Sequence, residues 1–156
     1  MLNEAGDLFS QELSRIGSAV RYWGLAEGDA VDEAVETVQT VTGADLKPYA
    51  PAHLAGVWGA SGITLSWLRR TRLGGDWRDG LGSVPLLEAV EAYEVEILDA
   101  AGDVLRVLAG ASEQVIYAEA DAVADFGAVP AALDVRVCQL SAAVGRGFAA
   151  RATLGP

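Results

Sequence analysis

The sequence predicts an all-β sandwich over residues 49–156, preceded by a small mixed segment over residues 1–48. Two features of the longer region support this prediction. Short apolar segments are separated by glycine-containing turns, and several of them alternate between apolar and polar residues. Alternation places one set of side chains in a core and the other in water, which is typical of antiparallel sheets packed face to face. The alternating segments are 63–67, 93–97 and 133–137.

Seven strands are expected in this region, and the alternation assigns faces to their side chains. It buries Trp67 and turns Glu94 and Glu96 towards solvent. Two carboxylates that lie two residues apart on one strand share a face, and a solvated sheet face is the ordinary place for them. A catalytic pair of a glycosidase is not expected, because its two carboxylates must lie opposite each other across a cleft. In chain order, the expected strands are 53–58, 63–67, 93–97, 104–108, 114–118, 133–137 and 148–154.

The first 48 residues form a different, more acidic segment, with nine acidic and three basic side chains. Strands are expected at 19–23 and 35–41, and the acidic stretch 27–36 is expected to be a solvated face or loop. A segment this small cannot bury a core of its own, so we expect it to dock onto a neighbour. A short helix is also expected, because four apolar residues share one helical face: Leu2, Phe9, Leu13 and Ile16.

Two prolines mark the boundary between these regions, in Lys47-Pro48-Tyr49-Ala50-Pro51. Proline lacks a backbone donor and disfavours helix in the residue before it, so the stretch is predicted to be an extended linker. A polyproline ligand for a partner is the alternative. Trp23 and Trp58 are expected to pack at the seam between the two domains.

The charge excludes several classes of function. The 156 residues contain 22 acidic and 11 basic side chains, for a net charge of -11. Proteins that bind nucleic-acid phosphates or anionic membrane surfaces need the opposite sign, so neither partner is expected, and nor is membrane insertion. One cysteine and one histidine cannot supply a disulfide or a metal cluster of these residues, and no cofactor is expected. A calcium ion held by Glu119, Asp121 and Asp125 is an alternative, although their spacing differs from that of an EF-hand loop.

Three stretches resemble the strands of a fibronectin type III module. Residues 51–54 with 62–67 resemble its proline-led first strand and tryptophan-bearing second strand, and residues 92–97 resemble its third. Residues 133–147 resemble the penultimate strand and its turn into the last. The resemblance implies a fibronectin-III-like (immunoglobulin-like) sandwich over 49–156. Leu133 stands where the family usually has a tyrosine, so the hydroxyl-to-backbone corner of that tyrosine is not expected here.

A narrower resemblance rests on longer motifs and extends from about Arg21 to Leu154. These motifs resemble the C-terminal region of the large tail-tip (host-specificity) protein of alphaproteobacterial siphophages and gene transfer agents. The motifs are LKPYAPAHL at 46–54, LSWLRRTR at 65–72, GDWRDG at 75–80, ADFG at 124–127, VCQLS at 137–141, VGRGF at 144–148 and ATL at 152–154.

The tail-tip resemblance implies a virion structural protein at the distal end of the tail. Its implied partners are other tail-tip or hub proteins, with three copies per particle as a homotrimer, and host-surface glycan is a further implied ligand. The large proteins of this family also have a glycoside-hydrolase-like barrel upstream. A chain of this length cannot hold that barrel, so its activity is not transferred.

The candidate functional residues lie in one arginine-rich loop that also contains a tryptophan. One interpretation is recognition of an anionic glycan or docking on an acidic neighbour, in which an exposed Trp77 stacks on a sugar ring or fills a partner's pocket. The other is a salt-bridged hairpin whose arginines pair with Asp76, Asp79, Glu94 or Glu96. The loop residues are Arg69, Arg70, Arg72, Trp77 and Arg78.

No catalytic motif is found, so an enzyme is not expected. His53 stands alone on a strand, and Cys138 has no histidine or aspartate motif around it. Two functions therefore compete. One is a structural role in the tail tip, and the other is a receptor-binding module for host-surface polysaccharide.

Overall fold

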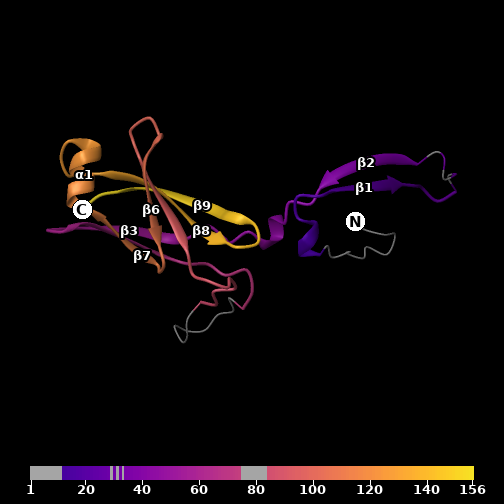
Figure 1. The fold of residues 1–156 in the computed structure, drawn as a ribbon, viewed down its shortest axis with the longest axis horizontal. Coiled ribbons are helices and arrows are strands. Elements are labelled where there is room, and N and C mark those ends of the chain that lie inside the picture. Colours follow the sequence, from indigo (N-terminus) through magenta and orange to yellow (C-terminus); the bar gives the residue numbers. More distant parts are fainter. Residues whose placement is uncertain (1–11, 29, 31, 33, 75–83) are drawn as a thin grey trace. The chain divides into compact units, whose positions relative to one another are not determined.

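The computed structural model describes residues 12–28, 30, 32, 34–74 and 84–156. The chain divides into two compact units, Met1–Leu46 and Lys47–Pro156. Figure 1 traces both units along the sequence.

The first unit contains a β-hairpin. Strand β1 (Ala19–Gly24) pairs in antiparallel register with β2 (Val35–Thr40), which confirms the two strands expected in this segment. Short 3-10 turns lie before and after the hairpin, η1 (Leu13–Arg15) and η3 (Ala44–Leu46). The expected helix is reduced to η1 among the described residues, and its first two apolar positions lie outside them.

None of the described residues of Met1–Leu46 is buried. A two-stranded hairpin without a covered apolar face is only marginally stable in water. The acidic stretch after β1 is exposed at each described position except Ala34, which is half-buried, as the charge run predicted.

The second unit is mostly β, with two antiparallel sheets and one short α-helix in the described residues (Figure 1). One sheet has the order β3-β4-β7 and the other β6-β5-β8-β9. All seven expected strands are present, and the all-β sandwich is the arrangement that the sequence predicted. The strands are β3 (Ala52–Gly59), β4 (Gly62–Leu68), β5 (Tyr93–Leu98), β6 (Val104–Gly110), β7 (Gln114–Ala118), β8 (Leu133–Ser141) and β9 (Gly145–Leu154).

Side chains from both sheets meet in one hydrophobic core. Trp67 on β4 is 3% exposed, as expected, and its ring meets that of Tyr93 on β5 edge to face, with centroids 5.0 Å apart. An aromatic pair of this kind contributes about 0.5–1.5 kcal/mol beyond its buried area. The other large core residues are Ile63, Leu65, Val95, Ile97, Tyr117, Leu133, Val135 and Val137.

The two tryptophans expected at a domain seam have different surroundings. Trp58 packs against the sandwich core, and its indole N–H donates to the carbonyl of Pro130 at 2.8 Å. Trp23 lies on β1 and is 55% exposed.

The proline pair belongs to the sandwich. Pro48 and Pro51 are both buried, and the Pro48 carbonyl accepts a hydrogen bond from the backbone N–H of Phe148 at 2.9 Å. The backbones approach so closely that a Cβ on Gly147 would lie 2.7 Å from that carbonyl oxygen, so glycine is required there. The interpretation of this stretch as a linker between the units, or as a polyproline ligand for a partner, is therefore wrong, because both prolines are buried in the second unit.

One α-helix, α1 (Glu119–Phe126), follows β7 and was not expected from the sequence. Glu119 and Asp121 lie in its first turn, where acidic side chains favour the positive end of the helix dipole. Gly127 ends the helix in the left-handed conformation, with its N–H bonded to the carbonyl of Val123 at 2.8 Å. Ala122 is the buried residue of the helix. In the part of the chain that is described, helices are too short to cross a bilayer.

Candidate functional site

The predicted arginine-rich loop begins where β4 ends. Trp77 and Arg78 lie outside the described residues. The remaining three arginines have different environments: Arg69 and Arg72 are half-buried, and Arg70 is exposed.

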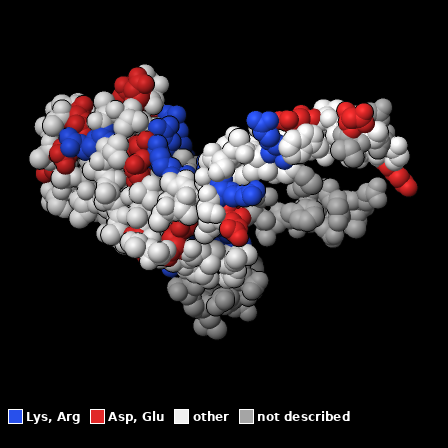
Figure 2. All heavy atoms as spheres, turned by 45° about the vertical axis from the view of Figure 1, so that its right-hand side comes forward, with Lys and Arg blue, Asp and Glu red and all other residues white. Residues whose placement is uncertain are grey.

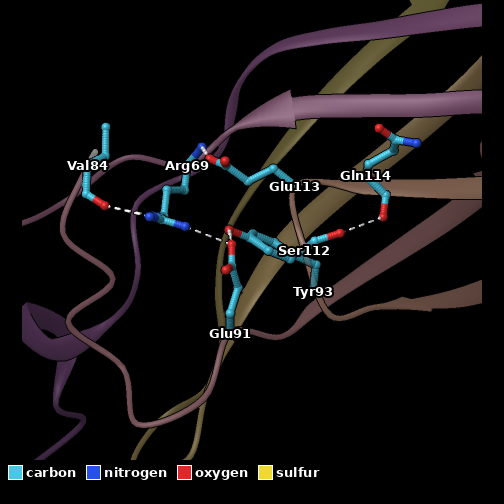
Figure 3. A network of polar contacts seen from close by, with 7 residues as sticks. All are labelled: Arg69, Val84, Glu91, Tyr93, Ser112, Glu113 and Gln114. Atoms are coloured by element: carbon cyan, nitrogen blue, oxygen red, sulfur yellow. Dashed lines mark hydrogen bonds and ion pairs between the residues drawn. The ribbon is translucent and has the colours of Figure 1, made fainter. Parts of the chain in front are cut away.

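Arg69 connects three segments that are distant in sequence (Figure 3). Its backbone N–H donates to Glu113 Oε1 at 2.6 Å, just before β7. Its guanidinium donates to Glu91 Oε1 at 2.8 Å and twice to the carbonyl of Val84, at 2.9 and 2.7 Å. Tyr93 Oη donates to the same Glu91 oxygen at 3.0 Å. The Arg69 fork therefore joins the end of β4 to the segment that leads into β5.

The electrostatics match this structural role. Burial opposes the charge of Arg69, but the carboxylates of Glu91 and Glu113 outweigh it, so the pKa of Arg69 lies above its ordinary value. Burial, helped by the hydrogen bond to Glu91, raises the pKa of the Tyr93 hydroxyl well above its usual range. Both groups keep one protonation state across physiological pH, which suits a fixed network and not a proton-transfer site.

Arg72 also forms an ion pair with an acidic residue that precedes β5. Its Nη2 lies 3.2 Å from Glu88 Oε1, with only 17% and 10% of the two side chains exposed. Two of the loop arginines thus hold the residues before β5 against the end of β4. The salt-bridged interpretation of the loop holds for these two residues.

The partners of these arginines differ from those expected. Asp76 and Asp79 lie outside the described residues. Glu94 and Glu96 pair instead with Arg136 and Arg146, and Glu96 is only 5% exposed where the alternation had placed it in water. It is covered by Arg136 of the neighbouring strand β8 and by Arg146 of β9, the next strand of the sheet. Sequence alternation assigns the face of a side chain, but not which long neighbours lie over that face.

Glu96 is the centre of an ion-pair cluster on the outer side of the four-stranded sheet. It accepts a hydrogen bond from Arg136 Nε, and Arg146 Nη2 lies 2.8 Å from its other carboxylate oxygen. Arg146 Nε also lies 3.0 Å from Glu94 Oε1. The hydrogen bond from Arg136 and the nearby charge of Arg146 hold the pKa of Glu96 below its usual value, against the opposing effect of burial. Figure 2 shows basic and acidic side chains side by side on the sandwich.

A second cluster involves two of the residues considered for calcium. Arg106 on β6 binds Asp125 with two hydrogen bonds, at 2.6 and 2.9 Å, and lies 3.1 Å from Asp121. Tyr117 Oη also donates to Asp125, at 2.7 Å. The hydrogen bonds from Arg106 and Tyr117 lower the pKa of Asp125. Arg106 thus occupies two of the three carboxylates that the calcium interpretation required, and no group of metal-binding residues occurs among the described positions.

Of the three loop arginines that the structure describes, Arg70 is the one that faces solvent. Its guanidinium carbon lies 5.4 Å from the centre of the Tyr49 ring, and Tyr49 is itself 41% exposed. A cation stacked on an exposed ring contributes about 0.5–1 kcal/mol and keeps its remaining donors available. Beside it is an open hollow of about 440 Å³. Its lining residues are Ala52, His53, Leu68, Arg69, Arg70, Val84 and Glu113.

His53 and Cys138 have structural surroundings. His53 adopts a φ of 52° at an irregularity in the β3–β4 register, and its side chain is exposed at the edge of the hollow. Cys138 is buried and accepts a hydrogen bond from Arg146 Nε at 3.4 Å. Neither has a catalytic partner among the contacts of the described residues.

Comparison with known proteins gives no family assignment: no family model matches the chain, and no curated protein matches it at a significant level.

Sequence reasoning missed the acidic partners of the arginine network. Glu88 and Glu91 lie after the loop and Glu113 lies before β7, so no local motif joins them to Arg69. The signal available was an excess of acids near the ends of expected strands, which does not say which arginine each one meets.

Proposed function

We propose that this chain is a structural protein of a phage-like tail tip, in which Met1–Leu46 docks on a neighbouring subunit and Lys47–Pro156 forms a fibronectin-III-like module. The observation that carries the docking role is the hairpin of the first unit, which has no buried residue among its described positions. A partner that covers one of its faces would supply the missing core.

The expected contact is the hairpin face that carries Trp23 and Val38, together with the ion pair of Arg21 and Glu36. Trp23 and Val38 are each 55% exposed. They are diagonal neighbours on one face, because Trp23 pairs with Glu36 and Arg21 pairs with Val38 in the β1–β2 register. Exposed tryptophans at such positions are frequent anchors of protein–protein interfaces.

Two further observations support the module. Seven strands divide into sheets of three and four, with the first two strands paired and the last two paired, as expected for an immunoglobulin-like sandwich. Most of the motifs that resemble tail-tip proteins fall on β3, β4, β8 and β9 and on the residues beside them, whereas the motif at 124–127 ends α1 and the motif at 75–80 lies outside the described residues. A homotrimer and a position at the distal end of the tail follow from that resemblance.

The location is tested by labelling purified virions with an antibody against this chain and imaging them by electron microscopy. We expect signal at the distal end of the tail. Virions that contain no copy of the chain would contradict the proposal.

The docking role is tested by replacing the hairpin anchors. We expect the double variant Trp23→Ser, Val38→Ser to remain soluble but to be absent from particles. The matched control is Leu105→Ser, Val107→Ser on β6, which removes apolar side chains of 41% and 53% exposure from the sandwich. Incorporation of the hairpin variant at the level of the control would refute docking through this face.

Receptor binding is the second candidate function, and the stacked pair of Arg70 and Tyr49 beside the hollow favours it. Arg70 is the informative residue, because changes at Arg69 or Arg72 would also disturb the fold. We expect Arg70→Ala particles to assemble normally and to adsorb to host cells at least tenfold more slowly if the hollow binds anionic glycan. The control is Arg151→Ala, an arginine whose side chain is 55% exposed on β9. Equal adsorption rates of the two variants would contradict receptor binding through this hollow.

A further inference from the structure

The hollow at the end of β4 has the size of a small-molecule site. Its volume of about 440 Å³ lies within the range of roughly 300–1,000 Å³ that is usual for such sites. Its wall is mixed, with the aliphatic side chains of Leu68 and Val84 beside polar side chains from three separate segments, His53, Arg70 and Glu113. A ligand that fits this lining needs both an apolar face and polar groups.

Arg70 is the cation of this lining that is left for a ligand. The neighbouring Arg69 is bound to Glu91 and to the Val84 carbonyl. Arg70, by contrast, forms no ion pair with a described residue, and its guanidinium stacks on the Tyr49 ring. Stacking covers one flat face of a guanidinium and leaves the N–H donors in its plane available. The ring also holds the side chain in place, so less rotamer entropy is lost when a ligand binds.

This single donor fork favours a planar group with one negative charge. Two parallel N–H groups of a guanidinium match the two oxygens of a carboxylate. A ligand with several negative charges is disfavoured, because Glu113 lies in the same lining and the chain has a net charge of -11. The hollow therefore suits a ligand with one carboxylate.

Glu113 supplies a hydrogen-bond acceptor to the same hollow. Its Oε1 accepts the backbone N–H of Arg69 at 2.6 Å, as Figure 3 shows. A carboxylate has about four acceptor positions, so capacity remains for a ligand donor. Its charge interacts favourably with the nearby Arg69 guanidinium, so it is already compensated within the chain. A compensated carboxylate gains less from a ligand ammonium group, and a hydroxyl is the better donor for it.

We infer that the hollow binds a carboxylated sugar of the uronic acid type, with its carboxylate on Arg70, a hydroxyl on Glu113 and its C–H face against Leu68 and Val84. A neutral sugar offers Arg70 no charged acceptor, and a simple aliphatic acid offers Glu113 no donor. The inference deepens the receptor-binding candidate function, on which its biological role rests, by naming the ligand class and the groups that recognise it.

The test is titration of the isotopically labelled full chain with D-glucuronate, followed by the NMR signals of its amides. We expect signals of the hollow, among them those of Ala52, Arg70 and Glu113, to shift and saturate. The dissociation constant should be on the order of 1 mM, since a single sugar is small and the hollow is open. D-Glucose, which has a hydroxymethyl group in place of the carboxylate, should bind at least about tenfold more weakly.

Variants of Arg70 test the assigned carboxylate contact. Arg70→Gln should weaken glucuronate binding at least about tenfold and leave the weaker glucose binding unchanged. Arg70→Lys keeps the charge without the planar fork and should restore only part of the affinity. The matched control is Arg151→Gln on β9, which removes the same charge from a side chain of 55% exposure and should bind glucuronate as the wild type does. Circular dichroism melting of each variant separates loss of binding from loss of folding.

Equal affinities for glucuronate and glucose would overturn the inference, and so would glucuronate binding that survives Arg70→Gln. Tighter binding of D-glucosamine than of glucuronate would assign the hollow to a cation and would also overturn it. An adsorption defect of Arg70→Ala particles without any glucuronate binding would refute this ligand class and keep the receptor-binding function. Glucuronate binding together with normal adsorption of those particles would support the ligand site and contradict the receptor-binding function.

Discussion

The outer faces of the two sheets of the sandwich differ in their side chains. The four-stranded sheet covers its outer side with arginines paired to Glu94, Glu96 and Asp134. The three-stranded sheet contains no Asp, Glu, Lys or Arg, and its outer side has mostly small, hydroxyl or aliphatic side chains. The inner sides of both sheets pack onto one core, so the difference between their outer sides is not required for packing.

This difference separates two kinds of surface. Side chains that satisfy each other within the chain leave few donors or acceptors for a partner, whereas an uncharged face costs little to desolvate. The charged sheet is therefore a closed surface, and the outer side of the three-stranded sheet is an open one.

Removing the centre of the charged cluster should destabilise the protein most. We expect Glu96→Ala to lower the free energy of unfolding by about 2–3 kcal/mol, because Arg136 and Arg146 lose a carboxylate whose side chain is only 6% exposed. Urea denaturation followed by tryptophan fluorescence measures the change.

The control is Glu94→Ala on the same strand. Its carboxylate is 28% exposed and pairs with Arg146 alone, so a loss below about 1 kcal/mol is expected. Equal losses in the two variants would mean that burial of Glu96 has no special role.

Acid should weaken the same cluster. Because the pKa of Glu96 is lower in the folded chain than its ordinary value of 4.5, its contribution is complete above that pH and is lost as pH falls through the folded-state pKa. The pKa of Asp125 is lowered as well, so its contribution is lost below its ordinary value of 3.8.

The measurement is the urea midpoint between about pH 7 and pH 3. We expect the wild-type midpoint to fall more steeply below about pH 4.5 than that of Glu96→Gln, which cannot titrate. Parallel curves would show that the cluster does not contribute to acid sensitivity.

Replacing Arg69, which follows β4, should have an intermediate effect on stability. We expect Arg69→Met to lower the free energy of unfolding by about 1–2 kcal/mol, since Glu91 and the Val84 carbonyl lose their donor. The control is Arg70→Met, whose side chain stacks on Tyr49 at the surface, with a loss of at most about 1 kcal/mol. A larger loss at Arg70 would reverse the assignment of structural and exposed arginines.

The smallest effect on stability should come from placing a charge on the outer side of the three-stranded sheet. Val57→Lys is expected to change the free energy of unfolding by no more than about 0.5 kcal/mol, because the side chain is 66% exposed in the monomer. Thermal melting measures this change in stability. A large loss would mean that the face is needed for folding, and the comparison of the two sheets would fail.

Much of the fold was predictable from local patterns. The alternation around Trp67, Val95 and Val135 identified strands whose inner faces form the core, because a side-chain period of two is a property of the extended backbone itself. Helix α1 was missed, since its eight residues contain no long apolar stripe. Its signals, acids in the first turn and Gly127 at the end, are weak without their context.

The site was predictable only in part. An arginine cluster was visible in the sequence, and it was the structure that divided it into the half-buried Arg69 and Arg72 and the exposed Arg70. The deciding partners, Glu88, Glu91 and Glu113, lie between 16 and 44 residues away from the arginines they bind. Ion pairing at such separations depends on how strands are brought together, which no local pattern encodes.

By itself, the sequence determined the strand positions, the buried tryptophan, the acidic net charge and the absence of charge from three strands. Each of these follows from residue identity and from the period of the extended chain. The tertiary structure alone decided that these three strands form one sheet, that Glu96 lies under two arginines, and that Pro48 and Pro51 belong to the sandwich. The physical reason is that pairing between strands and coverage by neighbouring side chains arise only when distant segments meet.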